Sequence, residues 1–162
     1  MATPSIELSR RSAIFLAGLA GLTGLGPMAI ARTAQSTRVD VFRDPSCGCC
    51  GRWIEHLRQN GFEVNVIETS DLQSIKKSAG VPSNLASCHT AKVGGYVIEG
   101  HVPANAIRRL LEQAPDALGL AVPGMPIGSP GMEGGDPVVY DVILFGQEPQ
   151  KTFGTFKGQE QQ

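Results

Sequence analysis

The chain has 162 residues, a length that fits one domain. Its 14 Lys and Arg residues nearly balance its 15 Asp and Glu residues, for a formal net charge of −1. No basic run interleaved with aromatic residues occurs, so the sequence argues against nucleic acid as a partner.

Residues 1–31 have the pattern of a cleaved signal peptide. The basic pair Arg10-Arg11 precedes an acid-free apolar stretch, and Ala29-Ile30-Ala31 forms an A-x-A cleavage pattern. The paired arginines resemble a twin-arginine signal, although general secretory export and an N-terminal membrane anchor are the alternatives. We expect twin-arginine export to the periplasm, a short linker over residues 32–37, and no membrane span in the mature chain.

The first part of the mature chain predicts a strand, a helix and a second strand. Residues 38–42 alternate apolar and polar side chains, as do residues 62–68. Between them, an apolar stripe at helical spacing ends at Asn60-Gly61; it comprises Cys50, Trp53, Ile54 and Leu57.

A second helix, a hairpin and a third helix follow. Thr69 or Ser70 can cap the second helix, which ends at Gly80. Residues 90–100 predict two short strands around Gly94-Gly95, and Pro103 fits the first position of the third helix. The order β-α-β-α-β-β-α, with cysteines between the first strand and its helix, predicts an α/β protein of thioredoxin-like layout.

The last third of the chain differs in composition. Residues 115–137 are rich in Gly and Pro, and a loop of that length in a small domain is typically functional or disordered. Residues 138–146 predict a strand that pairs with residues 151–156 as an added hairpin. We therefore expect one metal-binding domain over residues 38–156 and a flexible tail over 157–162.

The stretch "CGCC" holds three of the chain's four cysteines. Cys47 and Cys50 have C-x-x-C spacing at a strand-to-helix junction, where the helix N-terminus favours the thiolate. That pair alone indicates a thiol–disulfide oxidoreductase. A third thiol, Cys49, would attack a disulfide formed by this pair, so it does not fit a simple two-electron couple.

Three thiolates on one loop also fit a soft metal, with Cu(I) favoured over Zn(II) and iron–sulfur clusters. The second half of the chain supplies only Cys88 and His89, which does not fit a regular zinc ribbon. The neighbours Cys49 and Cys50 cannot easily bind one tetrahedral metal, but each can bridge different metals. The pattern therefore favours a cluster of several Cu(I) ions.

Other residues are candidates for the same site. In a thioredoxin-like layout Cys88 faces the cysteine loop, with His89 beside it; the alternative is a disulfide to Cys88. Met125 and Met132, in the Gly/Pro-rich loop, fit auxiliary copper ligands as well as they fit ordinary packing.

Three further side chains fit a role other than metal binding at least as well as they fit ligation. His56 falls on the polar side of its helix, which favours a solvated residue. His101 fits a structural role and ligation equally. Trp53 fits the core better than a cofactor contact.

Four motifs in order carry a family resemblance: "CGCCGRW", "GVPSNLASCHTA", "GGYVIEGHVP" and "GLAVPGMPIGSPGME". Together they resemble a bacterial family of metal-binding proteins of unknown function that includes the CopG-type periplasmic copper-resistance proteins. The resemblance spans residues 38–145. It implies a thioredoxin-like fold, a copper site, a role in copper homeostasis and redox interconversion of Cu(I) and Cu(II). The ligands that it implies are Cys47, Cys49, Cys50 and Cys88.

The residues and the resemblance predict an exported protein that holds Cu(I), as a multinuclear cluster, on these four cysteines and serves copper resistance. It would exchange copper with periplasmic donor or acceptor proteins and act, if it is an enzyme, as a copper oxidoreductase. The alternative is a periplasmic thiol–disulfide oxidoreductase that uses Cys47 and Cys50. A third interpretation is a structural domain with two disulfides and a partner-binding loop.

Overall fold

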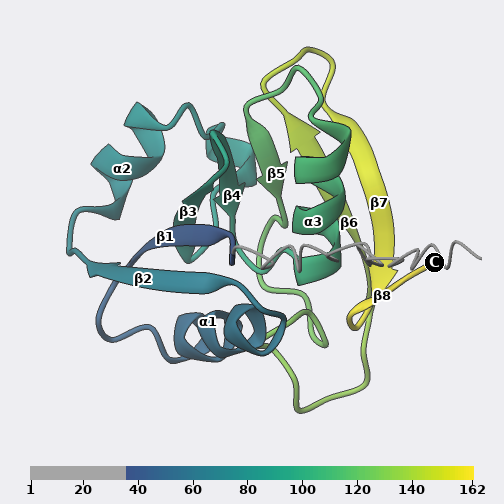
Figure 1. The fold of residues 1–162 in the computed structure, drawn as a ribbon. Coiled ribbons are helices and arrows are strands. Elements are labelled where there is room, and N and C mark those ends of the chain that lie inside the picture. Colours follow the sequence, from purple (N-terminus) through teal and green to yellow (C-terminus); the bar gives the residue numbers. More distant parts are fainter. Residues whose placement is uncertain (1–35) are drawn as a thin grey trace, which may run out of the picture. The chain divides into compact units, whose positions relative to one another are not determined.

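The structure, a computed structural model, describes residues 36–162 as a mixed α/β fold (Figure 1). The signal peptide and all but the last two residues of the linker lie outside the described residues. The strands are β1 (Arg38–Arg43), β2 (Glu63–Glu68), β3 (His89–Val93), β4 (Tyr96–Glu99), β5 (Gly119–Ala121), β6 (Val139–Phe145), β7 (Lys151–Lys157) and β8 (Glu160–Gln161). The helices are α1 (Gly48–Gln59), α2 (Leu72–Ser78) and α3 (Ala104–Gln113), with a 3-10 turn η1 (Ser83–Leu85).

All of these strands form one sheet, in the order β2-β1-β3-β4-β5-β6-β7-β8. β1 pairs in parallel with β2 and antiparallel with β3, and β4 pairs in parallel with β5. Apart from η1, the first seven helices and strands follow the predicted order β-α-β-α-β-β-α. The expected C-terminal hairpin is also present, because β6 pairs antiparallel with β7.

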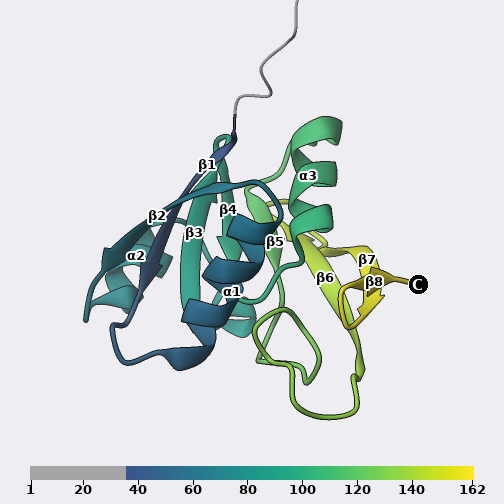
Figure 2. The same ribbon diagram turned by 60° about the horizontal axis from the view of Figure 1, so that its bottom comes forward.

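Helices lie on both faces of the sheet. α1 and α3 cover one face, and α2 lies on the other (Figure 2). Apolar side chains under α1 and α3 form the main core, which includes Val41, Trp53, Ile98, Ile107 and Leu120. Because side chains alternate along a strand, the neighbours of Ile98 and Leu120 face α2 and η1 in a smaller cluster of Leu85, Val97, Ala121 and Phe145.

The structure corrects two predictions in the last third of the chain. Residues 119–121, expected to lie in a loop, form the buried strand β5 between β4 and β6. The tail predicted to be flexible contains β8, which pairs with β7 through Phe156 and Gln161. Both strands are too short to show an alternating pattern, so only their pairing partners identify them.

Helix α2 also differs from its prediction. Its N-cap is Asp71, whose side chain accepts a hydrogen bond from the Ser74 backbone N–H at 3.1 Å, instead of Thr69 or Ser70. The helix buries Lys76 against the sheet. A charged inward side chain needs a partner, and the site described below contains it.

The Gly/Pro-rich loop after β5 is folded against α1. Gly131 has φ of +89°, and a Cβ there would lie 2.8 Å from the backbone nitrogen of Trp53 and 2.9 Å from the backbone oxygen of Cys49. Only glycine fits this close approach. Arg52 Nε donates to the Gly131 carbonyl at 2.8 Å and fixes the loop beside the cysteines.

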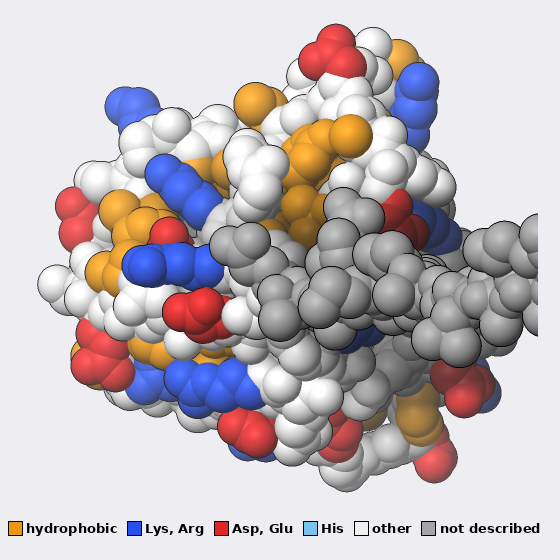
Figure 3. Space-filling model, in the orientation of Figure 1, with side chains coloured by type: hydrophobic (Ala, Val, Ile, Leu, Met, Phe, Trp, Pro, Cys, Tyr) orange, Lys and Arg blue, Asp and Glu red, His pale blue; other side chains and the backbone are white. Residues whose placement is uncertain are grey.

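Basic and acidic side chains are interspersed over the described part of the face drawn in Figure 3, in keeping with the small net charge. Among the described residues, no helix has the length and apolar character needed to span a membrane.

Candidate metal centre

The cysteine loop follows β1 and leads into α1. Cys47 is the N-cap of α1, and Cys49 and Cys50 lie in its first turn; the apolar stripe predicts this for Cys50. Arg43, the last residue of β1, donates to the carbonyls of Cys47 and Pro45 at 3.3 and 3.1 Å. The strand end therefore holds the loop in a conformation that directs its sulfur atoms toward one region.

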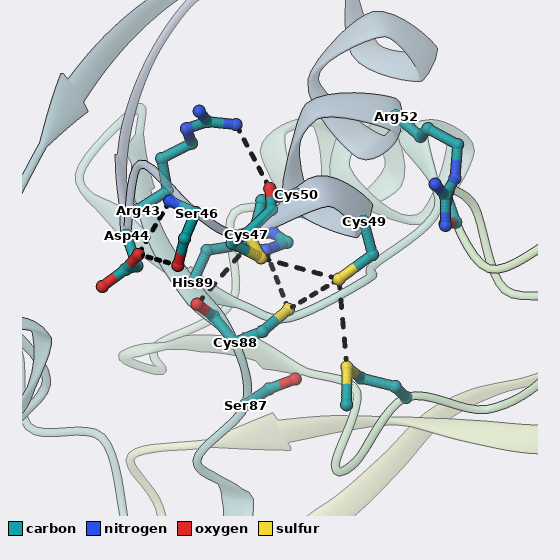
Figure 4. The surroundings of a disulfide bond; sticks show 12 residues. Arg43, Asp44, Ser46, Cys47, Cys49, Cys50, Arg52, Ser87, Cys88 and His89 are labelled. Atoms are coloured by element: carbon teal, nitrogen blue, oxygen red, sulfur yellow. Dashed lines mark hydrogen bonds between the residues drawn. A yellow bond between two sulfur atoms is a disulfide. The ribbon is translucent and has the colours of Figure 1, made fainter.

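All four cysteines meet in that region. Their sulfur atoms lie within 4.8 Å of one another. Cys49 lies at the centre, with its Sγ 3.6 Å from that of Cys47 and 3.9 Å from that of Cys88 (Figure 4). Cys47 and Cys50 form a disulfide, whereas Cys49 and Cys88 are free thiols. The described state is therefore an oxidised one, and reducing the disulfide with two electrons and two protons yields four thiols in one cluster.

Cys88 also contacts two imidazoles. Its Sγ lies 3.1 Å from His101 Nε2 and 3.3 Å from His89 Nδ1. Burial, followed by the charge and hydrogen bond of Cys49, raises the pKa of the Cys88 thiol to about 12. Without metal the thiol is therefore protonated at neutral pH, and binding a metal must displace that proton.

His89 and His101 are fully buried. Burial lowers the pKa of both histidines, and each stays neutral at pH 7 as a result. His101 Nδ1 lies 2.6 Å from the Pro130 carbonyl oxygen, which can only accept, so Nδ1 carries the proton. Sequence reasoning left the role of His101 open, and the structure places it at the cluster.

Of the other candidate ligands, Met125 lies beside the cluster, whereas Met132 and His56 make contacts elsewhere. Met125 Sδ lies 3.9 Å from Cys49 Sγ, at the edge of the cluster. Met132 makes only backbone hydrogen bonds among those described for it, with Ser129 and Gly128. His56, predicted to be solvated, is buried, and its Nε2 accepts from the Ala104 N–H at 3.1 Å. The first residue of α3 lies against this side of α1, which the period of α1 alone could not predict.

A buried ion pair holds the segment that carries Cys88. Lys76 Nζ contacts Glu99 Oε1 at 2.5 Å and donates to Thr90 Oγ1 at 3.0 Å. The same Glu99 oxygen accepts from the Ser87 backbone N–H at 2.6 Å. Thr90 completes the network by donating to the second Glu99 oxygen at 2.7 Å. The residue before Cys88 is thus tied to a charged pair inside the fold.

One side of the cluster faces an open hollow of about 410 Å³, lined by Gln73, Ala86, Ser87, Cys88, Gly124 and Met125. Met125 is 50 % exposed at its rim. Since Cys50 and the two histidines are buried, this hollow is the solvent side of Cys88.

The high pKa of Cys88 predicts its reactivity. In the metal-free disulfide form, Cys88 should react with iodoacetamide roughly 1,000-fold more slowly at pH 8 than in the unfolded chain, because only the thiolate attacks. Its rate should still rise tenfold per pH unit between pH 8 and 10, since folded Cys88 titrates at about 12. Peptide mass spectrometry resolves Cys88 from Cys49. A plateau below pH 10 would contradict the raised pKa.

The chain is similar to one protein family and to two solved structures. A family profile described as "protein of unknown function, DUF411" matches residues 85–132. No curated protein matches. Two solved structures, described as forms 2 and 1 of the copper resistance protein copG, are each 44 % identical to the chain, with TM-scores of 0.72 and 0.71. They cover 75 % and 76 % of this chain, and 99 % and 100 % of their own length is matched.

Proposed function

The chain belongs to the DUF411 family that includes the copper resistance protein copG, and from this premise we propose that it binds copper on its four clustered cysteines. The bound form is Cu(I), held as a multinuclear cluster by Cys47, Cys49, Cys50 and Cys88. The role is copper resistance: the protein takes up copper from a donor protein, holds it and passes it to an acceptor.

The convergence of four sulfur atoms within 4.8 Å carries the proposal. Thiolates are soft ligands and select Cu(I). The central position of Cys49, which lies close to both Cys47 and Cys88, suits a sulfur that bridges metal ions. The adjacent Cys50 contributes from the buried side of the helix. These residues therefore fit a copper cluster better than they fit a single tetrahedral ion.

The hollow beside Cys88 is the proposed route for copper. Met125 lies between solvent and Cys49, and its thioether is a soft, neutral donor that can hold Cu(I) weakly. Met132 is the second auxiliary candidate from the same loop.

The fold and the export signal belong to the same proposal. A cysteine loop between β1 and α1, with Cys88 opposite it before β3, supports a thioredoxin-like domain. Residues 1–31 would direct the chain to the periplasm through the twin-arginine route, which carries folded proteins. A cluster assembled before export would be protected from oxidation.

The disulfide between Cys47 and Cys50 adds a redox aspect. Its reduction makes two more thiolates available, so the redox state of the pair would govern how much copper the site holds. If the protein is an enzyme, it would be a copper oxidoreductase that interconverts Cu(I) and Cu(II) at the same site.

Copper content and free thiols, counted on the same sample of full-length exported protein, test the function. After reduction by a phosphine and anaerobic loading with Cu(I), we expect several copper ions per chain and all four thiols protected from alkylation. The phosphine-reduced chain without copper is the control and should show four reactive thiols. No bound copper with a re-formed Cys47–Cys50 disulfide would overturn the proposal.

The same disulfide favours a second candidate, a thiol–disulfide oxidoreductase. Such an enzyme would reduce or oxidise protein disulfides in turnover without any metal. Insulin reduction by the metal-free chain, abolished in Cys50→Ser and unaffected by a copper chelator, would favour this candidate.

A further inference from the structure

Cys88 belongs to two groups of metal-binding side chains. The first is the four-cysteine cluster. The second joins the same Sγ to His89 and His101, with donor atoms again within 4.8 Å of one another. The two histidines lie on the side of Cys88 away from solvent, since both are fully buried.

The lone pair of His101 is fixed toward Cys88. Because the Pro130 carbonyl holds the proton on Nδ1, the neutral imidazole presents an unprotonated Nε2 to the Cys88 sulfur 3.1 Å away. A backbone carbonyl bound to the distal nitrogen is the arrangement that orients histidines in metal sites. Gly131 permits this close approach of the loop, since a Cβ there would lie 3.2 Å from His101 Nδ1.

His89 has unused capacity to bind. Its Nδ1 lies 3.3 Å from Cys88 Sγ, and its Nε2 is buried without a hydrogen-bond partner among the described residues. The ring packs between Trp53, at 4.2 Å between centroids, and His101, at 5.2 Å. A neutral imidazole with its proton on Nε2 would present the lone pair of Nδ1 to the Cys88 sulfur.

We propose that Cys88, His89 and His101 form a second copper position, with one thiolate and two imidazole donors, that shares Cys88 with the four-cysteine cluster. One thiolate with two histidines is the donor set of copper sites that transfer electrons, and imidazole accepts Cu(II) as well as Cu(I). The four-sulfur group favours Cu(I) alone. The position rests on the proposed copper function and adds to it a place where copper can hold either oxidation state.

The shared sulfur links the two positions. In the metal-free protein the Cys88 S–H proton lies between the sulfur and the His101 lone pair. A copper ion that replaces this proton binds both atoms, and the proton leaves to solvent. Loss of one electron from that copper to a one-electron oxidant, such as ferricyanide in a titration, would change Cu(I) to Cu(II) without breaking a sulfur–sulfur or carbon–sulfur bond.

The disulfide form of a Cys49→Ser variant isolates the second position. Its Cys47–Cys50 disulfide removes two ligands and the substitution removes a third, so Cys88 is the sole free thiol. With Cu(I) as the probe, we expect one copper per chain, and X-ray absorption should detect both sulfur and nitrogen neighbours. A triple variant with serine at positions 47, 49 and 50 should give the same result without depending on the disulfide.

His101→Gln in the Cys49→Ser background should weaken this copper at least tenfold. His56→Gln is the matched control, because His56 is also a buried histidine but bonds to Ala104. Sulfur-only neighbours, no copper in the Cys49→Ser chain, or equal losses in the two histidine variants would overturn the inference. The proposed function fails separately, if the reduced wild-type chain binds no copper.

Discussion

Replacing Cys88 with serine is expected to remove most copper binding while leaving the fold unchanged. Cys88 is the one cluster cysteine that precedes β3, and both proposed copper positions include its sulfur. Loss of a residue that merely orients a metal ligand already lowers affinity about 10–100-fold, so loss of a shared ligand should exceed about 100-fold. Competition between the reduced variant and a chromophoric Cu(I) chelator measures the affinity.

The fold should tolerate this change. Cys88 is only partly buried, serine is slightly smaller, and its hydroxyl can donate to His101 Nε2 as the thiol does. Circular dichroism and urea unfolding check the fold, and Ser83→Ala, an exposed site in η1, serves as the neighbouring control. Full copper loading of Cys88→Ser would show that the other three cysteines suffice, against the four-thiolate proposal.

The sequence predicts most elements near the cysteines because their apolar periods are clear. The stripe of Cys50, Trp53, Ile54 and Leu57 is buried in α1 as expected. Gly94 and Gly95 have positive φ angles of 55° and 89° and turn β3 into β4 as expected. Local sequence suffices here, since the apolar stripe spans two helix turns and the glycine pair forms the turn by itself.

The histidine side of the site depends on pairing between distant residues. His101 lies 13 positions after Cys88, and the β3–β4 hairpin brings it back, with the Gly100 N–H donating to the His89 carbonyl. A hairpin register counted outward from Gly94-Gly95 would have placed residues 89 and 100 opposite one another. The carbonyl that accepts the orienting hydrogen bond of His101 belongs to Pro130, in a loop with no periodic pattern that predicts its position.

Buried polar side chains are a second group of residues that the helical periodicity of the sequence did not predict. His56 and Lys76 both occupy helix positions that face another element. Residue type places them in solvent, because histidine and lysine are seldom buried without partners. Their partners, Ala104 N–H and Glu99, lie 48 and 23 residues away, so only the tertiary structure reveals that they are satisfied.

Lys76→Met should lower the free energy of unfolding by about 3–5 kcal/mol, because the Glu99 carboxylate would remain buried without its cation. Both side chains are almost inaccessible, at 5 % and 0 % exposure, so water cannot replace the lost contact. Urea unfolding of the metal-free chain measures the loss. Lys77→Met, the exposed neighbour in α2, should change stability by less than about 0.5 kcal/mol.

The double variant Lys76→Met/Glu99→Gln separates charge from hydrogen bonding. A glutamine can still accept from the Ser87 N–H through its carbonyl oxygen and donate to Thr90 through its amide, while no buried charge remains. We therefore expect it to recover most of the free energy that Lys76→Met loses, with a favourable coupling between the two substitutions. Because Ser87 precedes Cys88, the same double variant should keep its copper. Additive losses would show that the ion pair itself stabilises the fold, and that neutral hydrogen bonds alone cannot hold the Cys88 segment.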